Sequence, residues 1–396
     1  MIIYFKFTDM IKSFLKIFLP TTLLLFSGCS KKGCKDPNAI NYDSSAKKDN
    51  NSCLYEEFDK EVLLSNITNN YIIPSYNQYN LNLKSLDSSI KEFTLQPTVL
   101  GLSKVRNSWH NALLSWQDVS FIDFGPSTLI ILKTQTNTFP ADTVQIDENI
   151  SNGNWNFNSI NSIDIKGFQA LDYLLNKRNL TESQRVTYYT NSQNAKDYLN
   201  AISDELVTNT AFVVSKWSTY KNDFISDFAT NASGSSVSEM INSMCLDYEF
   251  FVRRGKLGLP LGIFDLFSND PLPGLVECYH YGQSLEFTKR SIGSLQKYIN
   301  GIHYSSNENG IGLDDYMNFV NATSNNENLS SVINSKIDLI LTKLNNLNDP
   351  LSSELISNNS QVHLAYDAMQ DLVPLVKVDM TSALGVLITY ADNDGD

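Results

Sequence analysis

Two polar side chains stand three residues apart in the otherwise apolar stretch Gly-Phe-Gln-Ala-Leu-Asp-Tyr-Leu-Leu, residues 167–175. Residues three apart share one face of a helix, so Gln169 and Asp172 can approach one ligand together, with Tyr173 and Asn176 beside them. A carboxamide takes no proton at ordinary pH. The oxygens of this pair therefore suit hydrogen bonds to a polar ligand or, at most, a hard cation such as calcium.

The other face of the same predicted helix carries Phe168, Leu171 and Leu175, the spacing of a buried apolar stripe. The plain alternative to a binding site is therefore an ordinary amphipathic helix whose polar face meets water. From the residues alone, both interpretations stay open.

Other candidate ligand contacts lie outside this segment. Arg106 stands one turn before Trp109 and could hold an anion or orient Asp172, although a buried structural pair would use the same residues. Glu249 and Glu277 lie near predicted helix ends and could complete a pocket from the second half of the chain. Charged residues at such positions are usually solvated or serve the helix dipole.

The sequence lacks the common motifs for histidine-based metal sites and for phosphate binding. The four histidines are scattered and form no H-E-x-x-H pair, so a histidine-rich zinc site is not predicted. His110 is interpreted as a surface or satisfied core histidine. The sequence contains no P-loop, dinucleotide fingerprint, G-x-S-x-G elbow or C-x-x-C-H haem attachment motif.

The charge balance excludes one class of partner. The 396 residues carry a formal net charge of -13, whereas affinity for phosphate backbones rests mainly on clustered Lys and Arg. We therefore expect no nucleic-acid partner. Acidic faces attract cations only weakly and are screened by salt, so no specific metal follows from the charge.

Residues 1–28 are typical of an export signal. Lys12 and Lys16 precede an apolar run at residues 17–26 that is too short to span a bilayer comfortably. The run closes on Leu-Phe-Ser-Gly-Cys at residues 25–29, which resembles a bacterial lipobox. This resemblance implies that Cys29 becomes a lipidated N-terminus that anchors the protein to a membrane. The alternative is a plain signal peptide with a chance cysteine.

Export also permits disulfides. Cys34 and Cys53 bracket a turn-rich segment that resembles a small cysteine-bounded module of secreted Bacteroidota proteins. A bridge between them would staple a loop with too little apolar surface for its own core. Cys245 and Cys278 either pair with each other or remain buried free thiols.

The elements that must position these residues are predicted to be helices. From residue 56 onward, apolar residues recur at spacings of three and four, which predicts an all-α protein of two consecutive helical bundles, at residues 56–232 and 233–396, after a module at 29–55. The spacing of Trp109, Leu113 and Trp116 predicts a core stripe on one of these helices. The predicted helices cover residues 56–95 with an interruption at Ile73-Pro74, 98–121, 181–228 as one helix or two, 237–254, 275–302, 313–322, 327–347 and 361–373.

Two further signals concern the edges of these elements. Thr181 and Gln184 have the spacing of a capping box. The less regular region at residues 134–165, which leads into the segment 167–175, could cover a site as a loop.

The segment 167–175 resembles the G-x-H-x-x-E signature helix of imelysin-like proteins, with Gln169 in place of His and Asp172 in place of Glu. Family landmarks follow in the expected order over roughly residues 58–396: Arg106-x-x-Trp109, Trp116-Gln117, Phe124-Gly125-Pro126, residues 256–261, Val276-Glu277 and residues 384–396. The resemblance implies a two-lobed helical fold with a pocket between lobes, a cell-envelope location and an association with iron uptake. The family has also been labelled metallopeptidase. That label is weakened because Gln169 lacks the imidazole that titrates near neutrality and binds transition metals.

The leading hypothesis is a lipid-anchored envelope protein that acts as a non-catalytic binding or accessory component of iron uptake, alongside other uptake components. It would sit on the periplasmic or the surface face of an outer membrane. Its ligand is not specified, although iron or calcium at Gln169 and Asp172 is a candidate. One rival is a metal-dependent peptidase that uses Asp172 with ligands from elsewhere. Another is a surface scaffold or adhesion lipoprotein.

Overall fold

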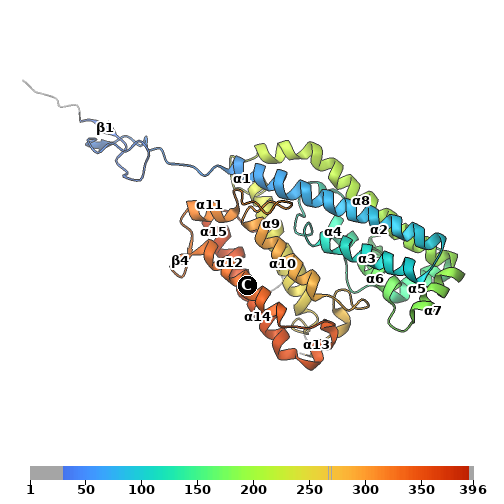
Figure 1. The fold of residues 1–396 in the computed structure, drawn as a ribbon. Coiled ribbons are helices and arrows are strands. Elements are labelled where there is room, and N and C mark those ends of the chain that lie inside the picture. Colours follow the sequence, from blue (N-terminus) through green and yellow to red (C-terminus); the bar gives the residue numbers. More distant parts are fainter. Residues whose placement is uncertain (1–29, 266, 269, 392–396) are drawn as a thin grey trace, which may run out of the picture. The chain divides into compact units, whose positions relative to one another are not determined.

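The structure, a computed structural model, describes residues 30–265, 267–268 and 270–391 and falls into two compact units that divide between Phe58 and Asp59 (Figure 1). The predicted export signal and Cys29 lie outside the described residues, so the lipid anchor stays a prediction. Within the described ranges, no helix combines the length and the apolar character that a membrane crossing needs.

The first unit is a small turn-rich module. Its two short strands, β1 (Lys32–Gly33) and β2 (Lys48–Asp49), pair in parallel. Aspartate side chains close its turns, as where Asp43 Oδ1 accepts the N–H of Ser45 at 2.9 Å. The predicted Cys34–Cys53 disulfide is confirmed. The bridge joins two ends of a segment whose buried apolar side chains are mostly small.

The second unit begins with a helical bundle built around long antiparallel helices. In Figure 1, α2 lies side by side with α3 and α8. The elements of this bundle are α1 (Lys60–Asn66), the π-helical turn η1 (Ile67–Ile72), α2 (Ile73–Leu95), α3 (Val99–Trp116), the 3₁₀ turn η2 (Gly125–Ile130), α4 (Leu132–Thr136), α5 (Thr143–Asn152), the 3₁₀ turn η3 (Ile160–Ser162), α6 (Gly167–Asn176), α7 (Glu182–Asn191) and α8 (Gln193–Ser226).

Local signals explain several of these boundaries. The predicted interruption before Pro74 is a switch from the π-helical η1 to α2, because proline has no N–H to donate. Thr98 caps α3 by accepting the N–H of Gly101 at 3.0 Å. The capping box of Thr181 and Gln184 is confirmed, and of the two alternatives for residues 181–228 the structure has two helices.

The predicted core stripe is confirmed, but one boundary is wrong. Trp109, Leu113 and Trp116 are buried at 0%, 0% and 3% exposure. Helix α3 ends at Trp116, five residues earlier than predicted, and residues 117–121 form turns. The region predicted to be irregular contains α5. The side chain of Asp142 caps the N-terminus of this helix by accepting the N–H groups of Val144 and Gln145.

The second bundle follows. Its elements are α9 (Ser236–Leu246), the π-helical η4 (Asp247–Gly258), the 3₁₀ turn η5 (Pro273–Leu275), α10 (Leu285–Ile299), α11 (Leu313–Phe319), β3 (Thr323–Ser324), β4 (Glu327–Asn328), α12 (Leu329–Asn345), α13 (Leu351–Ser357), α14 (Asn359–Pro374), the π-helical η6 (Leu375–Met380) and α15 (Thr381–Ala383). Helix α12 packs against both α10 and α14 (Figure 1).

Two predictions about this bundle are wrong. The helix expected to stop at Arg254 continues as η4 to Gly258, since π-type bonding carries the chain through Gly255. The helix expected over 275–302 begins only at Leu285, and residues 276–284 form a loop. Residues 59–391 lie in one compact unit, and the boundary between residues 232 and 233 stays a prediction.

Candidate functional site

Helix α6 is buried on almost every side. Gln169 is 4% exposed and Asp172 is 1% exposed, while Phe168, Leu171 and Leu175 are at 0%. The alternative of an amphipathic helix with a solvated polar face is therefore wrong. A buried carboxylate and a buried amide need partners, because an unpaired polar group in the interior is strongly unfavourable.

The first residue of α6 must be glycine. Gly167 has a φ of +72°, and a Cβ added there would lie 2.3 Å from the carbonyl oxygen of Thr136. Only glycine adopts this conformation readily, and the neighbouring backbone has no room for a methyl group. The close approach places α6 directly against the end of α4.

Gly167→Ala is therefore expected to lower the free energy of unfolding by roughly 2–3 kcal/mol. Urea unfolding of the purified protein would measure the change. The matched control is Gly293→Ala in α10, where an added Cβ meets nothing within 4 Å. That variant should be neutral or slightly stabilising, by at most about 1 kcal/mol. Equal destabilisation by both substitutions would contradict the role assigned to Gly167.

The partners of the two polar side chains are backbone groups of the loop at residues 276–284. Asp172 Oδ2 accepts the N–H of His280 at 2.9 Å, and Asp172 Oδ1 accepts the N–H of Tyr281 at 2.8 Å. Gln169 Oε1 accepts the N–H of Cys278 at 2.8 Å. We call these three bonds the loop clamp. These bonds explain why the helix predicted over this loop does not form. The N–H groups of Cys278, His280 and Tyr281 bond to side chains of α6, and Cys278 has a φ of +56°, which a right-handed helix excludes.

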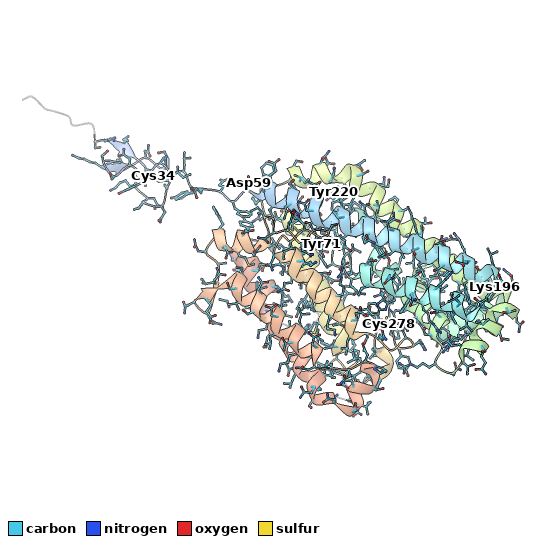
Figure 2. The ribbon with its side chains drawn as sticks, in the orientation of Figure 1. Cys34, Asp59, Tyr71, Lys196, Tyr220 and Cys278 are labelled. Atoms are coloured by element: carbon cyan, nitrogen blue, oxygen red, sulfur yellow. A yellow bond between two sulfur atoms is a disulfide. The ribbon has the colours of Figure 1, made fainter. Side chains whose placement is uncertain are left out.

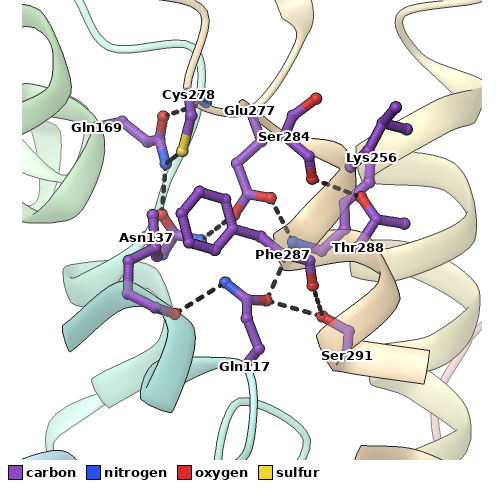
Figure 3. Close-up of polar contacts among 12 residues, drawn as sticks. Gln117, Asn137, Gln169, Lys256, Glu277, Cys278, Ser284, Phe287, Thr288 and Ser291 are labelled. Carbon is purple, nitrogen blue, oxygen red and sulfur yellow. Dashed lines mark hydrogen bonds and ion pairs between the residues drawn. The ribbon is translucent and has the colours of Figure 1, made fainter. Parts of the chain in front are cut away.

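A chain of polar contacts continues the clamp into the second bundle (Figure 3). Gln169 Nε2 donates to Asn137 Oδ1 at 2.7 Å, and Asn137 Nδ2 donates to Glu277 Oε1 at 2.8 Å. Glu277 pairs with Lys256, whose ammonium group also donates to Gln117 Oε1 at 3.1 Å. Cys278, labelled in Figure 2, lies where the helices of the two bundles approach each other. The contacts therefore join side chains of both bundles in a buried, mutually satisfied network.

A cavity of about 230 Å³ adjoins the clamp, and Gln169, Asp172 and His280 are among its lining residues. Phe139, Pro140, Ala141 and Thr143 line another part of it. The first part of the region at residues 134–165 therefore borders this cavity, and its role as a cover over a ligand site stays a prediction. The cavity is large enough for a small polar ligand or several waters.

Burial changes the protonation of two groups at this cavity. Loss of solvent raises the pKa of Asp172 to about 7, although N–H donors from His280, Asn176 and Tyr281 act in the opposite direction. Burial also lowers the pKa of His280 to about 4, with help from the positive charges of Arg178 and Lys177. His280 is therefore neutral near pH 7, and its buried Nδ1 has no hydrogen-bond partner among the described residues.

Arg106 and Trp109 brace α6 from α3. Arg106 donates from Nε and Nη2 to the carbonyl of Leu175, at 3.1 and 2.6 Å, and from Nη1 to both carboxylate oxygens of Glu182. Arg106 does not bond to Asp172, so neither an orienting bond to Asp172 nor a buried pair of these two residues is present. Its carboxylate partner is Glu182, whose side chain is 47% exposed. Trp109 Nε1 donates to the carbonyl of Phe168 at 3.1 Å. These bonds fix both ends of the helix.

Tyr173 and His110 lie at the margin of the site. The Tyr173 hydroxyl donates to Asp147 at 2.5 Å, and its ring centroid lies 5.1 Å from that of His280. His110 Nδ1 lies 3.3 Å from the hydroxyl oxygen of Tyr281. His110 is thus a partnered histidine, as expected.

The two glutamates predicted to complete the pocket, Glu249 and Glu277, lie in different surroundings. Glu277 belongs to the network described above. Glu249 instead accepts a hydrogen bond from Lys377 at 3.0 Å and another from the Tyr390 hydroxyl at 3.0 Å. It does not line the cavity beside Asp172. These two bonds attach the side chain of Glu249 to the C-terminal part of the chain.

Sequence reasoning missed Asn137 and His280 as site residues. Asn137 lies in a segment without periodic pattern, and His280 lies in the loop that was predicted to be helical. For His280 the available signal is its position two residues after Cys278 and three after Glu277. Of the alternatives for the cysteines, Cys245 and Cys278 are buried free thiols.

The donor set fits a metal ion only with rearrangement. In the described part of the chain, no group of three or more His, Cys, Asp or Glu side chains gathers as a metal site. The oxygens of Gln169 and Asp172 already accept the clamp bonds, and Asp172 Oδ1 also accepts from Asn176 at 3.1 Å. Iron or calcium at these residues stays a prediction, and such an ion would displace clamp bonds and move the loop.

Comparisons with known proteins identify one family and a shared fold. The model of the peptidase family described as Imelysin matches residues 72–377. A crystal structure of a Parabacteroides distasonis protein, described as an iron-regulated protein A precursor, superposes with a TM-score of 0.68 at 16% identity, covering 82% of this chain and 95% of that one. An imelysin-like protein from Psychrobacter arcticum superposes with a TM-score of 0.63 at 16% identity, covering 84% and 97%. No curated protein sequence matches this chain.

Proposed function

Because this chain belongs to the imelysin family, we propose that it is a cell-envelope component of iron uptake in which the altered signature helix serves binding and not hydrolysis. The observation that carries the proposal is the loop clamp. Gln169 and Asp172 occupy the two chemical positions of the signature, and both use their oxygens to hold backbone N–H groups. A carboxylate engaged in this way is a poor general base, since a base must meet the proton that it abstracts.

Several features support the cellular setting of this proposal. The lipobox-like residues 25–29 favour anchoring through Cys29, on the periplasmic or surface face of an outer membrane. The Cys34–Cys53 bridge is of the kind that persists in an oxidising compartment. The link to iron comes from the Parabacteroides protein that shares the fold and is described as iron-regulated. Partners would be other iron-uptake components.

Calorimetry on the purified protein tests the binding half of the proposal. Ferric iron, calcium and haem would be titrated separately into the wild type and into Asp172→Ala. We expect one of the three to bind the wild type and to bind the variant more weakly. Binding of none of them, or equal binding by both proteins, would remove the proposed role of the clamp. The iron link fails separately if expression is indifferent to iron limitation.

One observation favours a second candidate, a metal-dependent peptidase that uses Asp172. A carboxyl group with a pKa of about 7 stands at the same cavity as a neutral imidazole. Strongly perturbed pKa values, here raised for the carboxyl group of Asp172 and lowered for the imidazole of His280, are typical of acid–base sites. Cleavage of a protein substrate that is sensitive to chelators and abolished by Asp172→Asn would establish this function in place of the first.

Restoring the family's imidazole should change metal affinity. Gln169→His would place a second imidazole at the cavity that His280 and Asp172 line, so we expect its affinity for zinc to exceed that of the wild type by about tenfold or more. Gln169→Leu, which loses the same hydrogen bonds without adding a nitrogen ligand, is the control. Zinc titrations by calorimetry would compare the three proteins. Identical affinities would show that position 169 has no access to a metal ion.

A further inference from the structure

A second and larger cavity, of about 630 Å³, shares no lining residue with the cavity beside Asp172. One face of α10 forms its floor. Tyr71, Asp118 and Tyr304 are also among its lining residues. Tyr71, labelled in Figure 2, lies in η1 just before the long helix α2.

Gly293 opens the floor of this cavity. It lies in the middle of α10, where glycine is less favourable than almost any other residue. Close packing does not require glycine there, because an added Cβ would meet no heavy atom within 4 Å. A larger side chain would project into the cavity that Gly293 lines. The bare position therefore keeps open a space that the helix would otherwise fill.

The lining of the cavity is positively charged on balance. It includes three cations, Lys289, Arg290 and Lys297, against two carboxylates, Asp118 and Glu286, which gives 3 − 2 = +1. The whole chain has a formal net charge of -13. A net positive cavity in so acidic a protein attracts small anions locally while the remaining surface repels them.

Arg290 is held in place by a buried carboxylate. Its Nε and Nη2 donate to the two oxygens of Asp118 at 2.6 and 2.7 Å. Asp118 is 1% exposed and also accepts the hydroxyl groups of Ser294 at 2.5 Å and Tyr304 at 3.0 Å. The carboxylate is therefore fully engaged, and it raises the pKa of Arg290, which stays charged.

The guanidinium group of Arg290 has further N–H donors available for a ligand. It carries more N–H groups than its bonds to Asp118 use, and its side chain is 41% exposed. Of the two lysines, Lys297 donates to Asn307 at 2.6 Å. Lys289 forms no hydrogen bond or ion pair with the described residues, although its charge acts on Asp349. A fixed guanidinium beside flexible ammonium groups is an arrangement that recognises carboxylate and phosphate oxygens.

We propose that this cavity binds a small organic oxyanion. Its carboxylate or phosphate group would meet Arg290 with Lys289 or Lys297, and its body would lie over Gly293 against Tyr304. Glu286 disfavours a second negative group at its own end of the cavity. The proposal uses none of the clamp residues, so it stands apart from the function proposed for the site at Asp172.

Calorimetric titrations of the full-length protein at low salt would test this site with four probes: phenyl phosphate, phenylacetate, inorganic phosphate and uncharged phenylacetamide. We expect phenyl phosphate and phenylacetate to saturate the protein, and the tighter of the two identifies the preferred oxyanion. Inorganic phosphate should bind more weakly because it lacks an apolar body, and phenylacetamide should not bind. Failure of both aromatic anions to bind with a dissociation constant below about 10 mM would overturn the proposal.

Variants locate the binding. Gly293→Leu should abolish it without loss of helix, because leucine is a better helix former than glycine. Lys289→Gln and Lys297→Gln remove charge at the cavity, and at least one of them should weaken binding by about tenfold or more. Lys84→Gln, an exposed lysine of α2, is the matched control and should have no effect. Unchanged affinity in Gly293→Leu, or equal weakening by the control, contradicts the proposed site.

Discussion

Lys256→Ala should lower the free energy of unfolding by about 3–5 kcal/mol, the largest single effect that we expect from a charged residue of this protein. The ammonium group pairs with Glu277, and the two side chains are only 5% and 1% exposed. Without Lys256, the Glu277 carboxylate would remain buried opposite no cation. Chemical denaturation at pH 7 measures the loss.

Two comparisons show whether that loss comes from the uncompensated charge. Lys104→Ala breaks an ion pair with Glu92 whose side chains are 54% and 68% exposed, so it should change the free energy of unfolding by less than about 1 kcal/mol. Adding Glu277→Gln to Lys256→Ala should recover part of the stability, because the isolated charge is removed. A double variant as unstable as the single one would mean that lost packing, and not charge, is responsible.

The second large effect concerns pH and Asp172. Its pKa is about 7 in the folded protein against 3.8 for an ordinary aspartate, so between these pH values the folded state binds more protons than the unfolded state. Stability contributed by this group is therefore present below about pH 4 and lost as the pH rises to about 7. The difference between these two pKa values corresponds to roughly 4 kcal/mol of stability.

Asp172→Asn isolates this contribution, because asparagine keeps the shape of the protonated acid and does not titrate. The difference in unfolding free energy between wild type and variant should fall steadily from pH 4 to pH 7. The lowered pKa of His280 has the opposite effect, because it favours the unfolded state in acid. This contribution is present in both proteins, so it cancels when the unfolding free energy of the variant is subtracted from that of the wild type. A difference independent of pH would show that Asp172 titrates normally.

Local patterns in the sequence predicted most of the helices. The spacing of Trp109, Leu113 and Trp116 and the capping box at Thr181 depend on neighbours within a turn or two. The loop at residues 276–284 could not be predicted in this way. Its conformation depends on Asp172, which lies 108 and 109 positions away from the N–H groups that it accepts.

The sequence predicts only part of the candidate site, because local spacing is visible in the sequence and long-range partners are not. Gln169 and Asp172 share a helix face, and that spacing is visible in the sequence. The partners of Arg106 and Glu249 are set by tertiary packing, and each proved to bond elsewhere. Asn137 links Gln169 to Glu277 from a segment without pattern. Backbone N–H groups, which complete the site, are common to every non-proline residue and give no signal.

Attachment through main-chain N–H groups has a consequence for how this region tolerates change. The clamp bonds depend on the backbone conformation of the loop and not on the side chains that the loop carries. Substitutions at residues 279–281 other than proline would therefore keep the attachment while altering the chemistry of the cavity mouth. The segment is a natural position for engineering new recognition into this scaffold, with Gln169 and Asp172 left untouched as its anchor.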